Sequence, residues 1–247
     1  MQKTNFDSKK TSFRLNKFLA ERLGVSRRQA DELIKAKKVK IFPGGKNNEP
    51  FIAALGTHID KNDKVWYNGM MVPFSMGFTY LAINKPVGFV CSKHKQGESP
   101  TIYSLLPKKY QNLKTVGRLD KNSSGLILLT NDGDFAFQMT HPKFYKEKIY
   151  HILLNRDLQP IHQQMISDYG IDLPDGKSQL RLTHLVSDPT NKDYAKKWEI
   201  TMSEGRNRQI RRTFEAVGYK VEKLHRVGFG KYQLNNLKPG EFIEISI

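Results

Sequence analysis

Apolar residues recur at helical spacing near the start of the chain and predict a pair of short helices. Gly24 provides a stop for the first helix. Ser26 is a typical N-cap for a second helix over residues 27–37. Short strands are expected to follow at 39–42 and 64–67. The inward-facing residues of the two helices are Leu15, Phe18, Leu19, Leu23, Ala30, Leu33 and Ile34.

From Tyr80 onward, the apolar pattern changes to short strands separated by helical insertions. The unbroken apolar run at 125–130 predicts a buried strand. An amphipathic helix is expected at 207–217, with Ile210 and Phe214 facing inward. Further strands are expected at 80–84, 149–155 and 198–202, and further helices at 101–106 and 135–141. Because these elements do not alternate in regular βαβ units, we predict an α+β fold with a mixed, largely antiparallel sheet.

The distribution of charge divides the chain into parts. Residues 1–68 hold 15 Lys+Arg and 7 Asp+Glu, a charge of +8, whereas the other 179 residues hold the remaining +9 of the total of +17. Residues 69–78 contain Gly and Pro but no charged residue, and are predicted to be a linker. We therefore expect a flexible tail over 1–11, a small basic domain over 12–68 and a larger domain over 79–247.

Composition narrows the possible classes of function. The excess of 41 Lys+Arg over 24 Asp+Glu favours a polyanionic partner, above all nucleic acid. The single cysteine, Cys91, excludes an internal disulfide framework and a Cys-rich zinc site. No apolar run approaches the length of a membrane span, and the first ten residues lack the apolar core of a secretory signal. We expect a cytoplasmic protein with no membrane partner, and a monomer by default.

Basic residues gather on and around the second predicted helix. Cations at a helix start suit RNA phosphates, because helix N-termini already favour anions; a solvated basic face is the alternative. The order and spacing of residues 14–20, 24–30 and 39–41 resemble the S4 RNA-binding domain, although Pro-Gly-Gly-Lys-Asn-Asn replaces its usual Asn-Gly turn in the loop 42–49. The resemblance implies binding of structured RNA. The expected RNA contacts of this domain are Arg14, Lys17, Arg27, Arg28, Lys35 and Lys38.

The strongest chemical signal is the segment 116–125, Val-Gly-Arg-Leu-Asp-Lys-Asn-Ser-Ser-Gly. Asp120 stands where a short apolar run is followed by small polar residues. Such a loop can bring a carboxylate to the floor of a cleft. Arg118 or another cation could hold the carboxylate ionised there. One alternative is an Asx turn. A calcium loop is disfavoured because its twelfth position is Asn131 instead of Glu. No HExxH, GxGxxG, P-loop or GxSxG motif supports a metal hydrolase, a dehydrogenase, a nucleotide hydrolase or a serine esterase.

Four motifs resemble those of RNA pseudouridine synthases of the RsuA-type branch, in that family's order across residues 80–247, and an S4 domain in front is usual there. They are Lys85-Pro-Val-Gly88, Gly117-Arg-Leu-Asp120 with its continuation over 124–133, Glu147-Lys-Ile-Tyr150, and Glu204-Gly-Arg-Asn-Arg-Gln-Ile-Arg-Arg212. The resemblance implies that Asp120 is the nucleophile that attacks the target uridine and that Tyr150 lies against the base. It also implies that the reaction needs no cofactor and no metal.

The same resemblance implies a critical arginine at position 211 or 212. On the predicted helix Arg211 flanks the apolar stripe and could reach inward, so we favour it as the partner of the aspartate, whereas Arg208 and Arg212 face away from the stripe. Arg118, Arg208 and Arg212 are then expected to contact RNA.

The sequence therefore predicts a pseudouridine synthase that acts on ribosomal RNA. The run 207–212 resembles large-subunit members of the branch, which favours 23S over 16S rRNA. The alternative is a non-catalytic RNA-binding or ribosome-assembly protein on the same fold; the intact Asp120 argues against it. A glycosidase-like hydrolase needs two opposed carboxyl groups, and only one is well placed. The sequence decides neither which uridine is modified nor whether tRNA is also a substrate.

Overall fold

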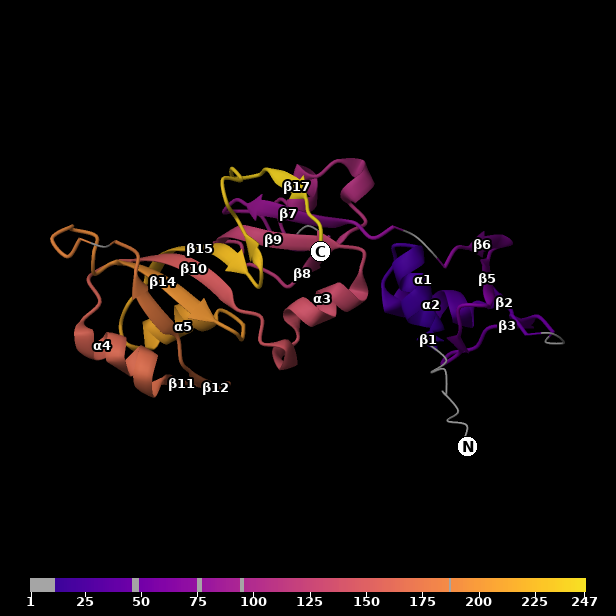
Figure 1. Cartoon of the computed structure of the whole chain (residues 1–247), viewed down its shortest axis with the longest axis horizontal. Coiled ribbons are helices and arrows are strands. Elements are labelled where there is room, and N and C mark those ends of the chain that lie inside the picture. The colour runs from indigo at the N-terminus through magenta and orange to yellow at the C-terminus, as the bar shows by residue number, and fades with distance from the viewer. Residues whose placement is uncertain (1–11, 46–48, 75–76, 94–95, 187) are drawn as a thin grey trace, which may run out of the picture. The chain divides into compact units, whose positions relative to one another are not determined.

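The protein divides into two compact units, Met1–Phe78 and Thr79–Ile247 (Figure 1). The computed structural model describes residues 12–45, 49–74, 77–93, 96–186 and 188–247. The expected flexible tail over 1–11 and part of the loop 42–49 lie outside the described residues. None of the helices in the described ranges is long and apolar enough to cross a membrane.

The N-terminal unit packs two helices on a small antiparallel sheet. The capping box is reciprocal, since Ser26 Oγ accepts from the backbone N–H of Gln29 and the Gln29 side chain accepts from the N–H of Ser26. The second helix ends at Lys35, two residues earlier than expected, because Lys37 takes a left-handed backbone with φ +56°. The elements of this unit are β1 (Phe13–Arg14), α1 (Leu15–Arg22), α2 (Arg27–Lys35), β2 (Val39–Phe42), β3 (Phe51–Ile52), β4 (His58–Ile59), β5 (Lys64–Tyr67) and β6 (Met70–Val72).

The segment 69–78, expected to be a linker, begins with strand β6. Asn68 and Gly69 both have positive φ, +49° and +78°, as the two-residue turn of a β-hairpin requires. β6 therefore pairs antiparallel with β5, and Val72 is buried in the core of the N-terminal unit. The Asn-Gly pair at this turn was the signal for a hairpin, and the expected linker overlooked it.

The C-terminal unit is built on a nine-stranded sheet in the order β13-β14-β10-β15-β9-β7-β17, with β16 on β15 and β8 on β9. All its pairings are antiparallel except that of β9 with β15. This confirms the predicted α+β class. Its strands are β7 (Tyr80–Lys85), β8 (Lys114–Val116), β9 (Ser124–Thr130), β10 (Lys148–Leu154), β13 (Arg181–His184), β14 (Lys197–Met202), β15 (Val221–Phe229), β16 (Tyr232–Gln233) and β17 (Phe242–Glu244), with a separate hairpin of β11 (Ile171–Leu173) and β12 (Gly176–Ser178).

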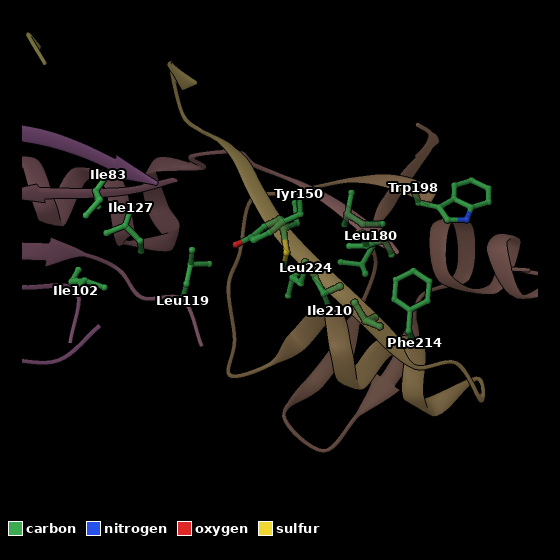
Figure 2. Close-up of a cluster of buried hydrophobic side chains, with 14 of the residues drawn as sticks. Ile83, Ile102, Leu119, Ile127, Tyr150, Leu180, Trp198, Ile210, Phe214 and Leu224 are labelled. Carbon is green, nitrogen blue, oxygen red and sulfur yellow. The ribbon is translucent and has the colours of Figure 1, made fainter. Parts of the chain in front are cut away.

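Helices cover the two faces of this sheet. The residues Ile102–Leu105, expected in an α-helix, form a 3-10 turn instead, with Ile102 fully buried. The α-helices are α3 (Gly133–Thr140), α4 (Pro160–Gln164) and α5 (Gln209–Ala216), and further turns are the 3-10 helices Lys108–Tyr110 and Pro142–Phe144 and the π-helix Met165–Tyr169. The main core runs along one face from Ile83 and Ile127 to Trp198 and Phe214, with Tyr150 between them (Figure 2).

The two halves of the sheet meet where β9 runs parallel to β15, over the pairs Ser124–His225 and Gly125–Arg226. Gly125 has φ +107°, and a Cβ there would lie 2.2 Å from the backbone oxygen of Arg226. Only glycine fits, because both its φ and the approach of the neighbouring backbone exclude a side chain.

Gly125→Ala is expected to destabilise the C-terminal unit more than Gly88→Ala. Gly88 also has a positive φ, +93°, but open space around the Cβ position, so its substitution carries only the backbone strain of about 1–3 kcal/mol. At Gly125 the clash with Arg226 adds to that strain. The measurement is urea unfolding followed by Trp198 fluorescence in a Trp66→Phe background, which leaves one tryptophan, in the C-terminal unit. Equal losses for the two variants would contradict the expected clash.

Candidate active site

A cavity of about 470 Å³ opens beside the parallel junction of the sheet. Its walls come from the loop 117–120, from β10 and β15, and from the segment 203–210 that leads into α5. The charged residues on these walls are Arg118, Asp120, Lys148, Glu204, Arg206, Arg208 and Arg226. With five cations against two acids, the cavity is suited to an anionic ligand such as a nucleotide.

Asp120 lies in a loop that is held by its backbone. Lys85 Nζ donates to the carbonyl of Ser123 at 2.6 Å, and Arg211 Nη2 donates to that of Asn122 at 2.9 Å. The N–H of Gly88 bonds the carbonyl of Lys121 at 2.8 Å. Among the described residues no hydrogen bond engages the Asp120 carboxylate, so the Asx-turn alternative is not supported, and the carboxylate is left facing the cavity.

The cation that pairs with Asp120 in the structure is Arg208, whose Nη1 lies 3.9 Å from Asp120 Oδ2. Arg208 caps α5 with a left-handed backbone, φ +47° and ψ +30°. Such strain in a non-glycine residue is characteristic of functional sites. The expectation that Arg208 faces away from the site assumed a helix from residue 207, but the helix begins at Gln209, so helical spacing does not apply to Arg208.

Arg211 supports the loop rather than pairing with the carboxylate. Its Nη1 donates to the carbonyl of Val221 at 2.5 Å while Nη2 holds Asn122, so it ties the Asp120 loop to the start of β15. Burial and the neighbouring Arg208 lower the pKa of Arg211, and Asp120 opposes this shift. Arg211 thus lies near the site, as expected, but it binds backbone carbonyls of residues 122 and 221 instead of the Asp120 carboxylate.

Arg212 lies elsewhere. Its guanidinium makes a two-pronged contact with Asp175, at 3.0 and 2.7 Å, and it does not line the cavity. Of the three arginines expected to contact RNA in this unit, Arg118 and Arg208 line the cavity, and Arg118 is exposed there.

Tyr150 forms part of the cavity wall from strand β10. It is 7% exposed and stands opposite Arg226 in the β10–β15 register. Its hydroxyl points toward the part of the core where Leu119 lies, next to Asp120 in the chain (Figure 2). The structure therefore brings Asp120 and Tyr150 to one cavity from segments 30 residues apart.

Arg226 is the site residue that sequence reasoning missed. It is 2% exposed, its Nε donates to the carbonyl of Leu126 at 2.8 Å, and its guanidinium lies 4.9 Å from the ring centre of Phe229. Its Nη2 has no hydrogen-bond partner among the described residues. An arginine two residues after Leu224, and therefore on the same face of the strand as that apolar residue, was the available signal.

Two lysines at the site have lowered pKa values. Burial lowers the pKa of Lys148 to about 8, Arg226 adds to the shift and Glu204 opposes it. Lys148 Nζ donates to the carbonyls of Ser203 and Glu204 at 3.1 and 3.2 Å. Burial likewise lowers the pKa of Lys85 to about 8, against the opposing effects of Cys91 and Asp120.

The basic residues expected to contact RNA in the N-terminal unit are mostly on its surface. Arg14, Arg28 and Lys35 line a shallow hollow together with Asp31. Arg27, in turn, donates weakly to Asn16 at 3.4 Å, and Lys35 pairs with Glu32 at 2.8 Å. Lys38 is exposed and Lys17 is half-buried.

Comparison with known proteins gives a consistent result. The profile of the RNA pseudouridylate synthase family matches residues 79–216, and that of the S4 domain matches residues 13–41. The chain is 34% identical to ribosomal small subunit pseudouridine synthase A of Pasteurella multocida, over 94% of this chain and 96% of that one. It is 33% identical to ribosomal large subunit pseudouridine synthase B of Bacillus subtilis, over 94% and 92%. A crystal structure of a pseudouridylate synthase, 32% identical, covers 95% of this chain and 96% of its own length with a TM-score of 0.64.

The buried Lys85 predicts a rise of stability with pH. Its pKa is lowered from 10.5 to about 8 by folding, so between these values the unfolded chain binds more protons and the free energy of unfolding increases with pH. Between pH 8 and 9.5 we expect a gain of about 1–2 kcal/mol in the wild type that Lys85→Met lacks. Urea unfolding at both pH values, with Trp198 as the sole tryptophan, measures this. Lys148 is present in both proteins, so its contribution to the pH dependence cancels in the comparison. If the free energy of unfolding rose equally with pH in the wild type and in Lys85→Met, the lowered pKa of Lys85 would be excluded.

Proposed function

This chain belongs to the RNA pseudouridine synthase family, and on that premise we propose that it converts a uridine of ribosomal RNA to pseudouridine with Asp120 as the nucleophile. The observation that carries the proposal is the state of the Asp120 carboxylate. It faces a cationic cavity, Arg208 lies at ion-pair distance, and hydrogen bonds from Lys85 and Arg211 go to carbonyls of its loop instead of its side chain. A carboxylate without competing donors is available to attack a bound nucleoside.

The reaction is balanced without any co-reactant. The Asp120 carboxylate forms a transient bond to the nucleoside, and the bond between N1 of uracil and C1′ of ribose breaks. The uracil rotates and a bond forms between its C5 and C1′. The proton on C5 leaves, N1 gains one, and the carboxylate is released. Substrate and product are isomers, so the proposed chemistry requires neither a redox partner nor a metal.

The remaining residues of the cavity have roles that follow from their positions. Tyr150 offers a buried aromatic wall beside Asp120 on which the uracil stacks. Its hydroxyl oxygen is the candidate acceptor of the C5 proton, provided that the hydroxyl gives up its own proton in the same step. Arg208 places a positive charge within 3.9 Å of the nucleophile, at the side of the carboxylate that faces the cavity. Arg211 acts as a positioning residue through its contacts with Asn122 and Val221.

Ribosomal RNA is proposed as the substrate because the relatives are named for ribosomal subunits. The identities of 34% and 33% to a small-subunit and a large-subunit enzyme do not separate the two. The run 207–212 resembles large-subunit members, and on that ground we propose 23S rRNA as the target. The exposed Arg14, Arg27, Arg28 and Lys38 of the N-terminal unit are proposed to contact RNA phosphates outside the cavity.

Asp120→Asn is expected to abolish isomerisation without abolishing RNA binding. The substitution keeps the shape of the side chain but removes the negative charge needed for attack. The assay follows tritium released from ribosomal RNA labelled at C5 of uridine, and we expect a loss of at least about 10³-fold relative to the wild type. Asp172→Asn, an exposed aspartate on β11, is the matched control. Equal release from Asp120→Asn and wild type would refute the nucleophile, and no release from either would favour a non-catalytic RNA-binding protein.

The choice of ribosomal subunit gives a separate prediction. We expect the purified wild type to release tritium from a 23S transcript and not from a 16S transcript. Mapping of pseudouridines in ribosomal RNA from cells with and without the gene should then show one missing site in 23S rRNA. A missing site in 16S rRNA would overturn the large-subunit assignment and would leave the proposed reaction intact. When the gene for Asp120→Asn is returned to cells that lack the wild-type gene, the missing pseudouridine should not reappear.

A further inference from the structure

An exposed aromatic cluster stands at the end of α3 and in the 3-10 turn that follows it. We call it the rim cluster; it consists of Phe137, His141, Lys143 and Phe144. The ring of Phe137 lies 4.7 Å from His141 and 5.7 Å from Phe144, centre to centre. Lys143 Nζ lies 5.2 Å from the ring centre of Phe137 and 4.8 Å from that of Phe144. The two phenylalanines are nevertheless 45% and 36% exposed.

The rim cluster borders the cavity that holds Asp120. Thr140 and Pro142, which lie between its members in the chain, line that cavity. The same segment touches the Asp120 loop, because a Cβ on Gly117 would lie 3.7 Å from Thr140 Cγ2. A ligand bound in the cavity therefore has the rim cluster next to it.

Packing within the protein does not explain the exposure of these rings. In α3 the inward positions are taken by Phe135, Ala136 and Met139, which pack on the core, whereas Phe137 points outward. The segment ends at Tyr145, which has a left-handed backbone, φ +47°, and is 77% exposed. A bulky residue in this conformation is an outlier, and such strain concentrates at binding sites.

We propose that the rim cluster binds an unpaired RNA base adjacent to the target uridine, by stacking on Phe137 or Phe144, with Lys143 on the neighbouring phosphate. The inference rests on the proposed function. Extruding a uridine from a folded RNA leaves its neighbours unstacked, and an aromatic surface at the cavity mouth offsets that loss. Aromatic rings interleaved with a cation are the usual composition of surfaces that bind single-stranded nucleic acid.

The chemistry of the cluster favours RNA over a protein partner. Lys143 stands among the rings and Lys146 follows, the cavity walls carry more cations than acids, and the chain has a net charge of +17. Two rings also present far less area than the roughly 1,200 Å² of a small specific protein interface.

The test compares the paired variants Phe137→Ala/Phe144→Ala and Phe137→Tyr/Phe144→Tyr in the tritium-release assay on whichever ribosomal RNA the wild type modifies. We expect the alanine pair to raise KM by about tenfold or more, as the loss of a stacked base does. The tyrosine pair, which retains the rings, should keep the wild-type KM, and kcat at saturating RNA should change little in either. Tyr169→Ala removes a ring that is 66% exposed and lies outside the cavity lining, and serves as the control.

Two further measurements distinguish stacking from charge and from loss of folding. The slope of log affinity against log salt should stay unchanged in the alanine pair and flatten by about one in Lys143→Gln, because only the lysine releases a counterion. Benzoylphenylalanine in place of Phe144, in an Asp120→Asn background, should crosslink within a few nucleotides of the modified uridine. This readout requires no turnover, and Trp198 fluorescence in the Trp66→Phe background shows whether each variant is folded.

The outcomes separate the two proposals. Wild-type turnover with an unchanged KM in the alanine pair, or crosslinks distant from the modified uridine, would overturn the rim cluster alone. Crosslinks to a ribosomal protein instead of RNA, when pre-ribosomal particles are used, would assign the cluster to a protein partner and overturn it as well. Absence of wild-type turnover on every ribosomal RNA would remove the proposed function, and the rim cluster as a substrate contact would fall with it.

Discussion

The parallel pairing of β9 with β15 joins the two halves of the nine-stranded sheet, and the cavity is built around this junction. Gly125 must have no side chain there, because the backbone of Arg226 passes within 2.2 Å of its Cβ position. This close contact places the start of β9 beside β15, the strand that carries Arg226. The loop that carries Asp120 directly precedes β9 and is placed there with it. Tyr150 then enters the cavity from β10, which pairs with the other edge of β15. The close contact at Gly125 thus places the Asp120 loop beside Arg226, and the β10–β15 pairing adds Tyr150 to the same cavity.

A second feature concerns the cations around the Asp120 loop. Lys85 and Arg211 are placed so that their donors meet backbone carbonyls of residues 122 and 123. Lys85 is buried and Arg211 is half-buried. A cation removed from water needs polar partners, and these carbonyls provide them. These hydrogen bonds support the loop while the carboxylate faces the cavity. Arg208 is different, because it reaches the carboxylate from the exposed side at 3.9 Å and in a strained backbone. Support of the loop and pairing with the acid are therefore divided between different arginines.

The surface around the cavity continues the same chemistry outward. Inside, five cations and two acids, one of them Asp120, line the walls; beside the cavity, the rings of Phe137 and Phe144 lie next to Lys143. A nucleotide extruded from RNA presents a phosphate, an apolar base face and unstacked neighbours. The cavity and its rim offer a complementary group for each of these, and the N-terminal unit, whose residues 13–41 match the S4 domain, carries exposed basic residues of its own.

Much of this was available from the sequence by itself. Local periodicity and the Ser26 cap predicted both N-terminal helices, and contiguous motifs predicted the family. The same motifs pointed to Asp120 and Tyr150, which the fold brings to one cavity. What only the tertiary structure decided depends on contacts between distant segments. The cation beside Asp120 is Arg208 and not Arg211. The helix begins at Gln209, and Arg208 precedes it with a left-handed backbone. Helical spacing along the sequence therefore could not predict the direction of the Arg208 side chain. Arg226 entered the site because β15 pairs with two strands far from it in the sequence. A motif specifies which residue types occur in order, whereas the direction of a side chain follows from backbone conformation and strand pairing, and these are set only when the chain is folded.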